Sequence, residues 1–157
     1  MDKIPTTKEG LHRLEDELKR LKSEERPAII RAIAEAREHG DISENAEYNA
    51  ARERQSFVEG RVAELEDMVS RAEVIDTSKL TGKVIRFGAK VKVSDEETDE
   101  ETDYFIVGSH ESDIASGRLS ITSPLARALI GKTIGDVVEV TTPRGHKSYE
   151  IVRVSYG

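Results

Sequence analysis

Residues 36–48 read AREHGDISENAEY, and this stretch decides the fold of the first half of the chain. Gly40 follows a run of helix-forming residues and is typical of a helix C-terminus, because glycine reaches the left-handed backbone conformation without steric cost. Asp41 and Glu44 then have the acid-x-x-Glu spacing of a newly capped helix. A connection this short joins antiparallel neighbours. The stretch therefore predicts the turn of a helical hairpin.

The residues on either side of this turn have the pattern of two long amphipathic helices. Thr6 and Glu9 have the Thr-x-x-Glu spacing of a capping box at the start of the first helix. Pro27 removes one amide donor, so we expect a bend there, after which the helix continues with its apolar stripe shifted in phase. The seam of the first helix is expected at Leu11, Leu14, Leu18, Leu21, Ile29, Ile33 and Ala36. The seam of the second is expected at Val58, Val62, Leu65, Val69 and Ala72.

Composition limits the classes of protein that the chain can be. Its 157 residues, at about 150 per domain, make one domain or two small ones. A rod of two helices has little interior, and charged stems lying across its seam account for the 35% of charged residues.

Cysteine is absent, which excludes disulfides and thiolate zinc sites and leads us to expect the cytoplasm. With a mean hydropathy of −0.54, we expect no membrane span and no signal peptide.

The net charge of −7 excludes a protein that coats nucleic acid through a broadly basic surface. Any contact with nucleic acid must therefore be local.

The second half of the chain changes to short β-rich segments, which are typical of a sheet. Ser123 and Pro124 have the pattern of a helix N-cap and a first helical residue, and an apolar face follows as far as Gly131. Residues 94–103 are mostly acidic and predict a solvated hairpin loop. Together the two halves predict an α+β fold. Strands are expected at residues 84–87, 89–93, 104–107, 119–122, 137–141 and 149–154.

The acidic residues at the predicted turn have two readings. Acids in the first turn of a helix offset its dipole and cap free amides, so Asp41, Glu44 and Glu47 need no further function. Alternatively, two carboxylates three positions apart share a hard cation such as Mg²⁺, which they hold weakly unless a partner adds ligands. On the second reading we expect neither a stably bound metal nor an activity of the protein alone.

Basic residues flank the same turn. Arg37, Arg52 and Arg54 either form ion pairs on the helix surface or hold a phosphate backbone near the carboxylates. His39 also belongs to the turn, but no second histidine stands in helical register with it, which favours a solvated side chain over a metal ligand.

The chain resembles the GreA/GreB transcript cleavage factors of bacteria, and most closely the GreA type. The resemblance rests on AREHGDISENAEYNAARE at 36–53, EVIDTSKL at 73–80, SPLARALIGK at 123–132 and DVVEVTTPRG at 136–145. It implies an antiparallel coiled coil with an acidic tip over residues 1–76. It further implies, over residues 80–157, a domain similar to the FK506-binding-protein (FKBP-like) fold, with an antiparallel sheet and one short helix.

The resemblance also implies a function. The C-terminal domain would dock on bacterial RNA polymerase through Ser123 and Pro124, although Thr122 stands where the family pattern has Asp or Asn. The coiled coil would enter the secondary channel, where Asp41 and Glu44 help to hold the second catalytic Mg²⁺ of the polymerase. The result is cleavage of backtracked RNA by the polymerase, with Arg37 and Arg52 contacting the nascent 3′ end.

On this reading the protein is a monomeric factor. It is not an enzyme, has no cofactor of its own and has no membrane partner. Two alternatives stay open. One is a related protein that occupies the same channel and inhibits polymerase without promoting cleavage. The other is a prolyl isomerase or chaperone, suggested by the implied C-terminal fold, although isomerase pockets of that fold are lined by aromatic residues and this chain has no Trp.

Overall fold

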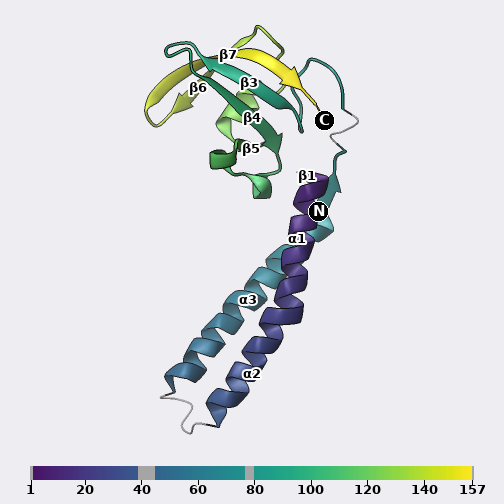
Figure 1. Cartoon of the computed structure of the whole chain (residues 1–157), viewed down its shortest axis with the longest axis vertical. Coiled ribbons are helices and arrows are strands. Elements are labelled where there is room, and N and C mark those ends of the chain that lie inside the picture. The colour runs from purple at the N-terminus through teal and green to yellow at the C-terminus, as the bar shows by residue number, and fades with distance from the viewer. Residues whose placement is uncertain (1, 39–44, 77–79, 157) are drawn as a thin grey trace. The chain divides into compact units, whose positions relative to one another are not determined.

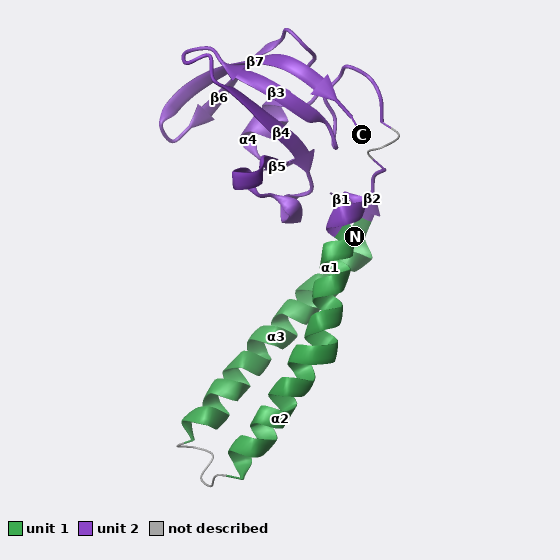
Figure 2. Cartoon of the chain, in the orientation of Figure 1, with its two compact units in different colours: residues 1–2, 11–72 green, residues 3–10, 73–157 purple. Residues whose placement is uncertain are grey.

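The computed structural model describes residues 2–38, 45–76 and 80–156, and the chain divides into two units (Figures 1 and 2). Unit 1 comprises residues 1–2 and 11–72, and unit 2 comprises residues 3–10 and 73–157. The fold class is α+β, with helices in the first part of the chain and a curled sheet in the second. No described helix combines the length and the apolar character that crossing a membrane requires.

Unit 1 is the predicted helical hairpin. Its first arm runs through α1 (Lys8–Arg20), the π-helical η1 (Leu21–Glu25) and α2 (Arg26–Arg37), and its second arm is α3 (Ala46–Arg71). Contacts between the arms pair early residues of one with late residues of the other, so the arms are antiparallel. The predicted helical position of Ala72 is wrong, because α3 ends at Arg71 and Ala72 begins the short strand β2 (Ala72–Val74).

Pro27 does not interrupt the first arm. The expected continuation of the helix is confirmed, since α2 begins at Arg26 directly after η1 and Pro27 occupies its second position. The preceding turn is π-helical, and the Arg26 amide donates to the Leu21 carbonyl five residues back. A π turn holds one more residue than an α turn, which shifts the apolar stripe between Leu21 and Ile29.

The seam between the arms is apolar in the middle and charged at its borders. Ion pairs cross between the arms, with Arg61 Nε 2.8 Å from Glu17 Oε1 and Arg26 Nη2 2.7 Å from Glu59 Oε1. Charged side chains thus join the two arms at the borders of the seam. The buried seam residues are Leu14, Leu21, Ile29, Ile33, Ala51, Val58, Val62 and Leu65.

The start of α1 differs from the predicted capping box. Thr7 Oγ1 accepts the Gly10 amide at 3.0 Å, and the Thr7 amide donates to Glu111 Oε2 at 3.1 Å. The predicted Thr6–Glu9 pair is wrong, since Glu9 instead lies 3.6 Å from Arg118. The acid that completes the cap is Glu111, which stands 104 positions after Thr7 in the chain.

Unit 2 is built on a five-stranded sheet with the order β5-β4-β3-β7-β6. The pairs β3–β4, β3–β7 and β6–β7 are antiparallel, whereas β5 runs parallel to β4, so the expectation of an antiparallel sheet is wrong for that one pair. A separate two-stranded sheet joins β1 (Ile4–Thr6) to β2. The strands of the larger sheet are β3 (Lys90–Asp95), β4 (Glu101–Val107), β5 (Arg118–Ser120), β6 (Val137–Thr142) and β7 (Gly145–Ser155).

Among residues 80–156, one helix and two single 3-10 turns accompany the sheet. The predicted helix is α4 (Pro124–Leu129), and the turns are η4 (Ser109–Glu111) and η5 (Ile114–Ser116). The core lies between α4 and one face of the sheet. Its fully buried members include Val91, Val93, Ile106, Leu129 and Ile151.

Several predicted segments of unit 2 have different bounds in the structure; β5 ends at Ser120 rather than at residue 122, and β7 begins at Gly145 rather than at residue 149. Residues 84–87 form no regular strand, although Ile85 is buried and exchanges backbone hydrogen bonds of 2.9 Å with Gly131 and Lys132. The expected loop at 94–103 is shorter than predicted, because Ser94 pairs with Glu101 and thereby extends both strands. Backbone pairing between β3 and β4 therefore continues past the apolar residues of the two strands.

Candidate functional site

The hairpin turn carries the predicted acidic site. Asp41 and Glu44, together with His39, lie outside the described residues. The two helix ends that border the turn are described: α2 ends at Arg37 and α3 begins at Ala46. The part of the site that the structure describes is therefore the end of α2 and the start of α3.

Asn45 joins these borders with one amide group. Its Nδ2 donates to the Ala36 carbonyl oxygen at 2.6 Å, and its Oδ1 accepts the Tyr48 amide at 3.1 Å. The first bond satisfies a carbonyl at the end of α2, and the second caps α3. Asn45 is the N-cap, so the predicted start of this helix at Asp41 is wrong. One side chain thus bonds to both arms, to the end of α2 and to the start of α3.

The arginines near the turn fall into two groups. Arg54 forms an ion pair with Glu25 across the hairpin, as the surface reading predicts. Arg37 instead lies over the Tyr48 ring, 5.9 Å from its centroid, and Arg52 donates to Gln55 Oε1 at 2.9 Å. Within residues 2–38, 45–76 and 80–156, neither Arg37 nor Arg52 forms an ion pair. Both are exposed, so their charges are accessible to an anion.

The predicted docking residues lie at the start of α4. Ser123 Oγ accepts the Ala126 amide at 3.2 Å and donates to the Ser120 carbonyl at 2.7 Å, so the N-cap prediction is confirmed. Pro124 is exposed at the first helical position, where its fixed φ suits the helix. Thr122 bonds through its amide and its hydroxyl to Ser120 Oγ, which holds the residue before the cap.

Ser123 and Pro124 line an apolar depression of about 270 Å³ in unit 2. Ile114 borders it with 62% of its surface exposed, a large value for an isoleucine. We call this surface the α4 depression. Its other lining residues are Tyr104, Leu119, Leu125, Val140, Thr141, Thr142 and Pro143.

Sequence reasoning missed Asn45 and Ile114. Asparagine is among the preferred N-cap residues, and its position before Ala46 was a usable signal. Ile114 had no such signal, because the α4 depression joins segments between residues 104 and 143 that only the fold brings together. In the part of the chain that the structure describes, no group of three or more His, Asp or Glu residues is arranged to hold a metal ion.

These features define a two-unit α+β protein with one candidate surface at a hairpin turn and another beside a short helix. Family models match nearly the whole chain. The model described as "Transcription elongation factor, N-terminal" matches residues 4–74, and "Transcription elongation factor, GreA/GreB, C-term" matches residues 80–156. The chain belongs to the GreA/GreB family of transcription elongation factors.

Two named relatives of high sequence identity agree with this assignment. The chain is 63% identical over 157 residues to transcription elongation factor GreA of Rhodospirillum rubrum, covering 100% of both chains. It is 65% identical over 156 residues to that of Beijerinckia indica, covering 99% of both. Among solved structures, the GreA factor homolog Gfh1 of Thermus thermophilus is 28% identical, with 98% of this chain and 99% of that chain covered and a TM-score of 0.45.

Proposed function

We propose that this protein is a bacterial transcription elongation factor that stimulates RNA polymerase to cleave backtracked nascent RNA. The observation that carries the proposal is that the family models match both halves of the chain in order, residues 4–74 and 80–156. The factor acts in the cytoplasm as a monomer and is not itself the nuclease. The hairpin enters the secondary channel of the polymerase and brings its turn to the active site.

The proposed catalytic contribution comes from Asp41 and Glu44. Carboxylate oxygens are the ligands that Mg²⁺ prefers, so the chemistry of this donor pair suits the Mg²⁺ of the polymerase. That metal, when bound, stabilises charge on the attacking and leaving oxygens of the phosphodiester. Two carboxylates alone hold it weakly, which explains why the factor would need the ligands of the polymerase. Asn45 supports this role because it ties together the two described helix ends between which both acids stand in the sequence.

Arg37 and Arg52 are proposed to contact the extruded RNA. Both lie near the borders of the turn, and neither is neutralised by an ion pair among the described residues. A guanidinium group donates two parallel hydrogen bonds to a phosphate, which suits it to hold the RNA backbone beside the carboxylates.

The α4 depression is the proposed docking surface for the polymerase. Ser123 and Pro124 form part of its wall, and the exposed Ile114 offers an apolar contact at its border. An apolar side chain of the polymerase is its proposed occupant. The lining does not favour a prolyl isomerase, because Tyr104 is the single aromatic residue among the residues that line it.

The test is a stalled, backtracked elongation complex, scored for RNA fragments and for resumed synthesis. Asp41→Ala and Glu44→Ala are expected to lower stimulated cleavage by about 100-fold, because each removes a ligand used in the transition state. Glu47→Ala is the matched control. It removes an exposed acid from the first turn of α3 and is expected to keep full stimulation.

Two outcomes contradict the proposal. Undiminished cleavage with either variant would remove the tip acids from the mechanism. A wild-type factor that slows the polymerase without producing fragments would instead identify an inhibitor of the same channel. Incubation of the factor with RNA and Mg²⁺ alone is expected to give no hydrolysis.

A further inference from the structure

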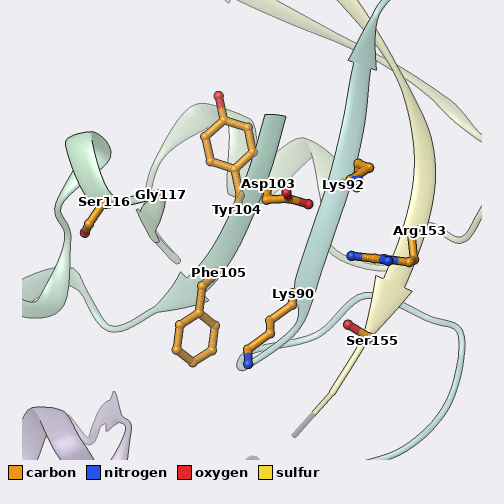
Figure 3. Close-up of a pocket in the computed structure, with 9 residues that line it drawn as sticks. All are labelled: Lys90, Lys92, Asp103, Tyr104, Phe105, Ser116, Gly117, Arg153 and Ser155. Carbon is orange, nitrogen blue, oxygen red and sulfur yellow. The ribbon is translucent and has the colours of Figure 1, made fainter. Parts of the chain in front are cut away.

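A pocket in unit 2 gathers three cationic side chains around one recess (Figure 3). It has a volume of about 210 Å³ and is lined mainly from β3, β4 and β7. Lys90 and Lys92 alternate along β3 with the buried Val91 and Val93, so their side chains lie on the face opposite the core. Arg153 adds the third cation from β7. We call this recess the sheet pocket.

The strand register places two of these cations directly opposite each other. Lys92 pairs with Arg153 across β3 and β7, and like charges in opposed positions destabilise a sheet. Asp103 is the partner of Lys92 on β4. Nevertheless, no ion pair within the described residues involves Lys92, Arg153 or Asp103. The repulsion between the two cations is relieved when an anion binds between them.

Lys90 supplies the third cation of the sheet pocket. Lys90 pairs with Phe105 across β3 and β4, and its Nζ lies 5.7 Å from the centroid of the Phe105 ring. The electron-rich face of an aromatic ring attracts a cation and so restricts its position. Ser155, the partner of Lys90 on β7, adds a hydroxyl group to the same lining. The pocket thus offers charge and hydrogen-bond donors from three neighbouring strands.

Size and charge together select the ligand. Three cations and the single carboxylate of Asp103 give this pocket a formal charge of about +2, in a chain whose net charge is −7. A volume of about 210 Å³ is below the range of pockets that enclose a whole small molecule. It suits one phosphate group of a longer strand, and the exposed Lys90, Arg153 and Ser155 leave room for that strand to continue along the surface.

We propose that the sheet pocket binds a phosphodiester group of single-stranded RNA. The flexible backbone of a single strand can place a phosphate in a recess between β-strands, and its charge satisfies the opposed pair Lys92 and Arg153. This contact is separate from those of the hairpin turn and needs no polymerase. It holds even if the protein does not stimulate cleavage.

The test measures fluorescence anisotropy of a labelled single-stranded RNA of about 12 nucleotides with the full chain at about 50 mM salt. Lys92→Ala/Arg153→Ala is expected to weaken binding about tenfold and to reduce the slope of log affinity against log salt by about 0.7, the change expected for one phosphate of a single strand. Lys83→Ala/Arg144→Ala is the matched control. It removes the same two charges from exposed positions of unit 2 outside the sheet pocket and is expected to stay within about twofold of wild type.

Several results would overturn the proposal. The first is equal loss of RNA affinity in the pocket variant and its control. The second is loss confined to Arg37→Ala/Arg52→Ala, which would assign RNA binding to the hairpin alone. The third is a glutamate peptide, inorganic phosphate or nucleoside triphosphate that binds the sheet pocket more tightly than RNA does. Circular dichroism of each variant separates these results from a loss of folding.

Discussion

At the scale of single residues, Asn45 has the largest proposed effect on the tip. Its one amide group both donates to the Ala36 carbonyl and caps α3, so the two helix ends cannot separate without losing the bond to Ala36. Each bond contributes about 1 kcal/mol to stability. The proposed role of the tip acids therefore predicts that loss of the Asn45–Ala36 bond lowers stimulated cleavage.

Asn45→Asp tests that role. An aspartate still accepts the Tyr48 amide, but it cannot donate to Ala36 and instead places an oxygen against a carbonyl. Stimulated cleavage is expected to fall about tenfold while helix content is retained. The bond that holds the start of α3 to the end of α2 is lost, whereas the cap on α3 is kept. Asn49→Asp makes the same charge change four residues later at an exposed helical position. Equal cleavage by the two variants would exclude a positioning role for Asn45.

Gly10 is explained by the buried carboxylate of Glu111. Glycine within a helix costs about 1 kcal/mol relative to alanine, and nothing in the sequence around α1 accounts for it. In the structure a Cβ at residue 10 would collide with the Glu111 side chain. Glu111 is 6% exposed and accepts the amides of Thr7 and Gly108. The close approach of this acid therefore requires glycine.

A double-mutant cycle on these two residues makes the explanation testable. Gly10→Ala alone is expected to destabilise the protein despite the better helix propensity of alanine. Glu111→Ala alone is expected to cost about 2 kcal/mol or more, because buried amides lose their acceptor. In the Glu111→Ala background, Gly10→Ala is expected to become stabilising. Urea unfolding supplies all four free energies, and additive effects would contradict the assigned contact.

At the scale of elements, the sequence predicted what periodicity controls and missed what distant partners control. The apolar repeats of Leu14 to Ile33 and Val58 to Leu65 predicted the arms of the hairpin correctly. The predicted starts of α1 and α3 were wrong because Thr7, with Glu111, and Asn45 supply their caps, whereas local spacing indicated other acids. Residues 84–87 were predicted as a strand because burial of Ile85 produces the same pattern without regular pairing.

The ion pairs between the arms predict an acid-sensitive hairpin. The hydrogen bond from Arg61 lowers the pKa of Glu17, and that from Arg26 lowers the pKa of Glu59. A carboxylate with a lowered pKa in the folded state contributes stability above its unfolded pKa and loses it as the pH falls through the folded value. The melting temperature of the helical signal is therefore expected to fall as the pH drops below about 4.

Paired substitutions isolate this contribution. Glu17→Gln/Glu59→Gln is expected to melt earlier than wild type at pH 7 and to lose less stability between about pH 5 and pH 3. Glu24→Gln/Glu35→Gln removes two exposed acids of the first arm for which the structure gives no ion pair, and it should follow the wild-type profile. Identical profiles for both doubles would assign the acid sensitivity to other groups.

At the scale of the whole molecule, the proposed function separates docking from chemistry. The residues of the tip and of the start of α4 were predicted from a resemblance carried by short motifs. The α4 depression was not predicted, since its lining comes from segments far apart in the sequence. The same holds for the sheet pocket, whose cations belong to β3 and β7 and meet only through strand register.

Ile114→Asp tests docking on its own. A charge at the border of the α4 depression is expected to weaken binding to polymerase by about tenfold or more. Cleavage at saturating factor should then recover, because the tip is unchanged. Ile134→Asp is the matched control, as Ile134 is an exposed isoleucine of unit 2 that does not line the depression. A titration of cleavage against factor concentration compares the two variants. An equal shift of the half-maximal factor concentration in both would show that the α4 depression is not the docking surface.

The Thr7–Glu111 contact has a consequence for biosynthesis. The ribosome makes residues 3–10 first and Glu111 only after the whole hairpin has been synthesised, so the nascent N-terminus waits for its capping acid. The same order limits how the gene can be truncated. A fragment that starts at residue 80, where the second family model begins, would keep a buried acid without its threonine donors. A fragment that joins residues 3–10 to residues 80–157 through a short linker would restore them.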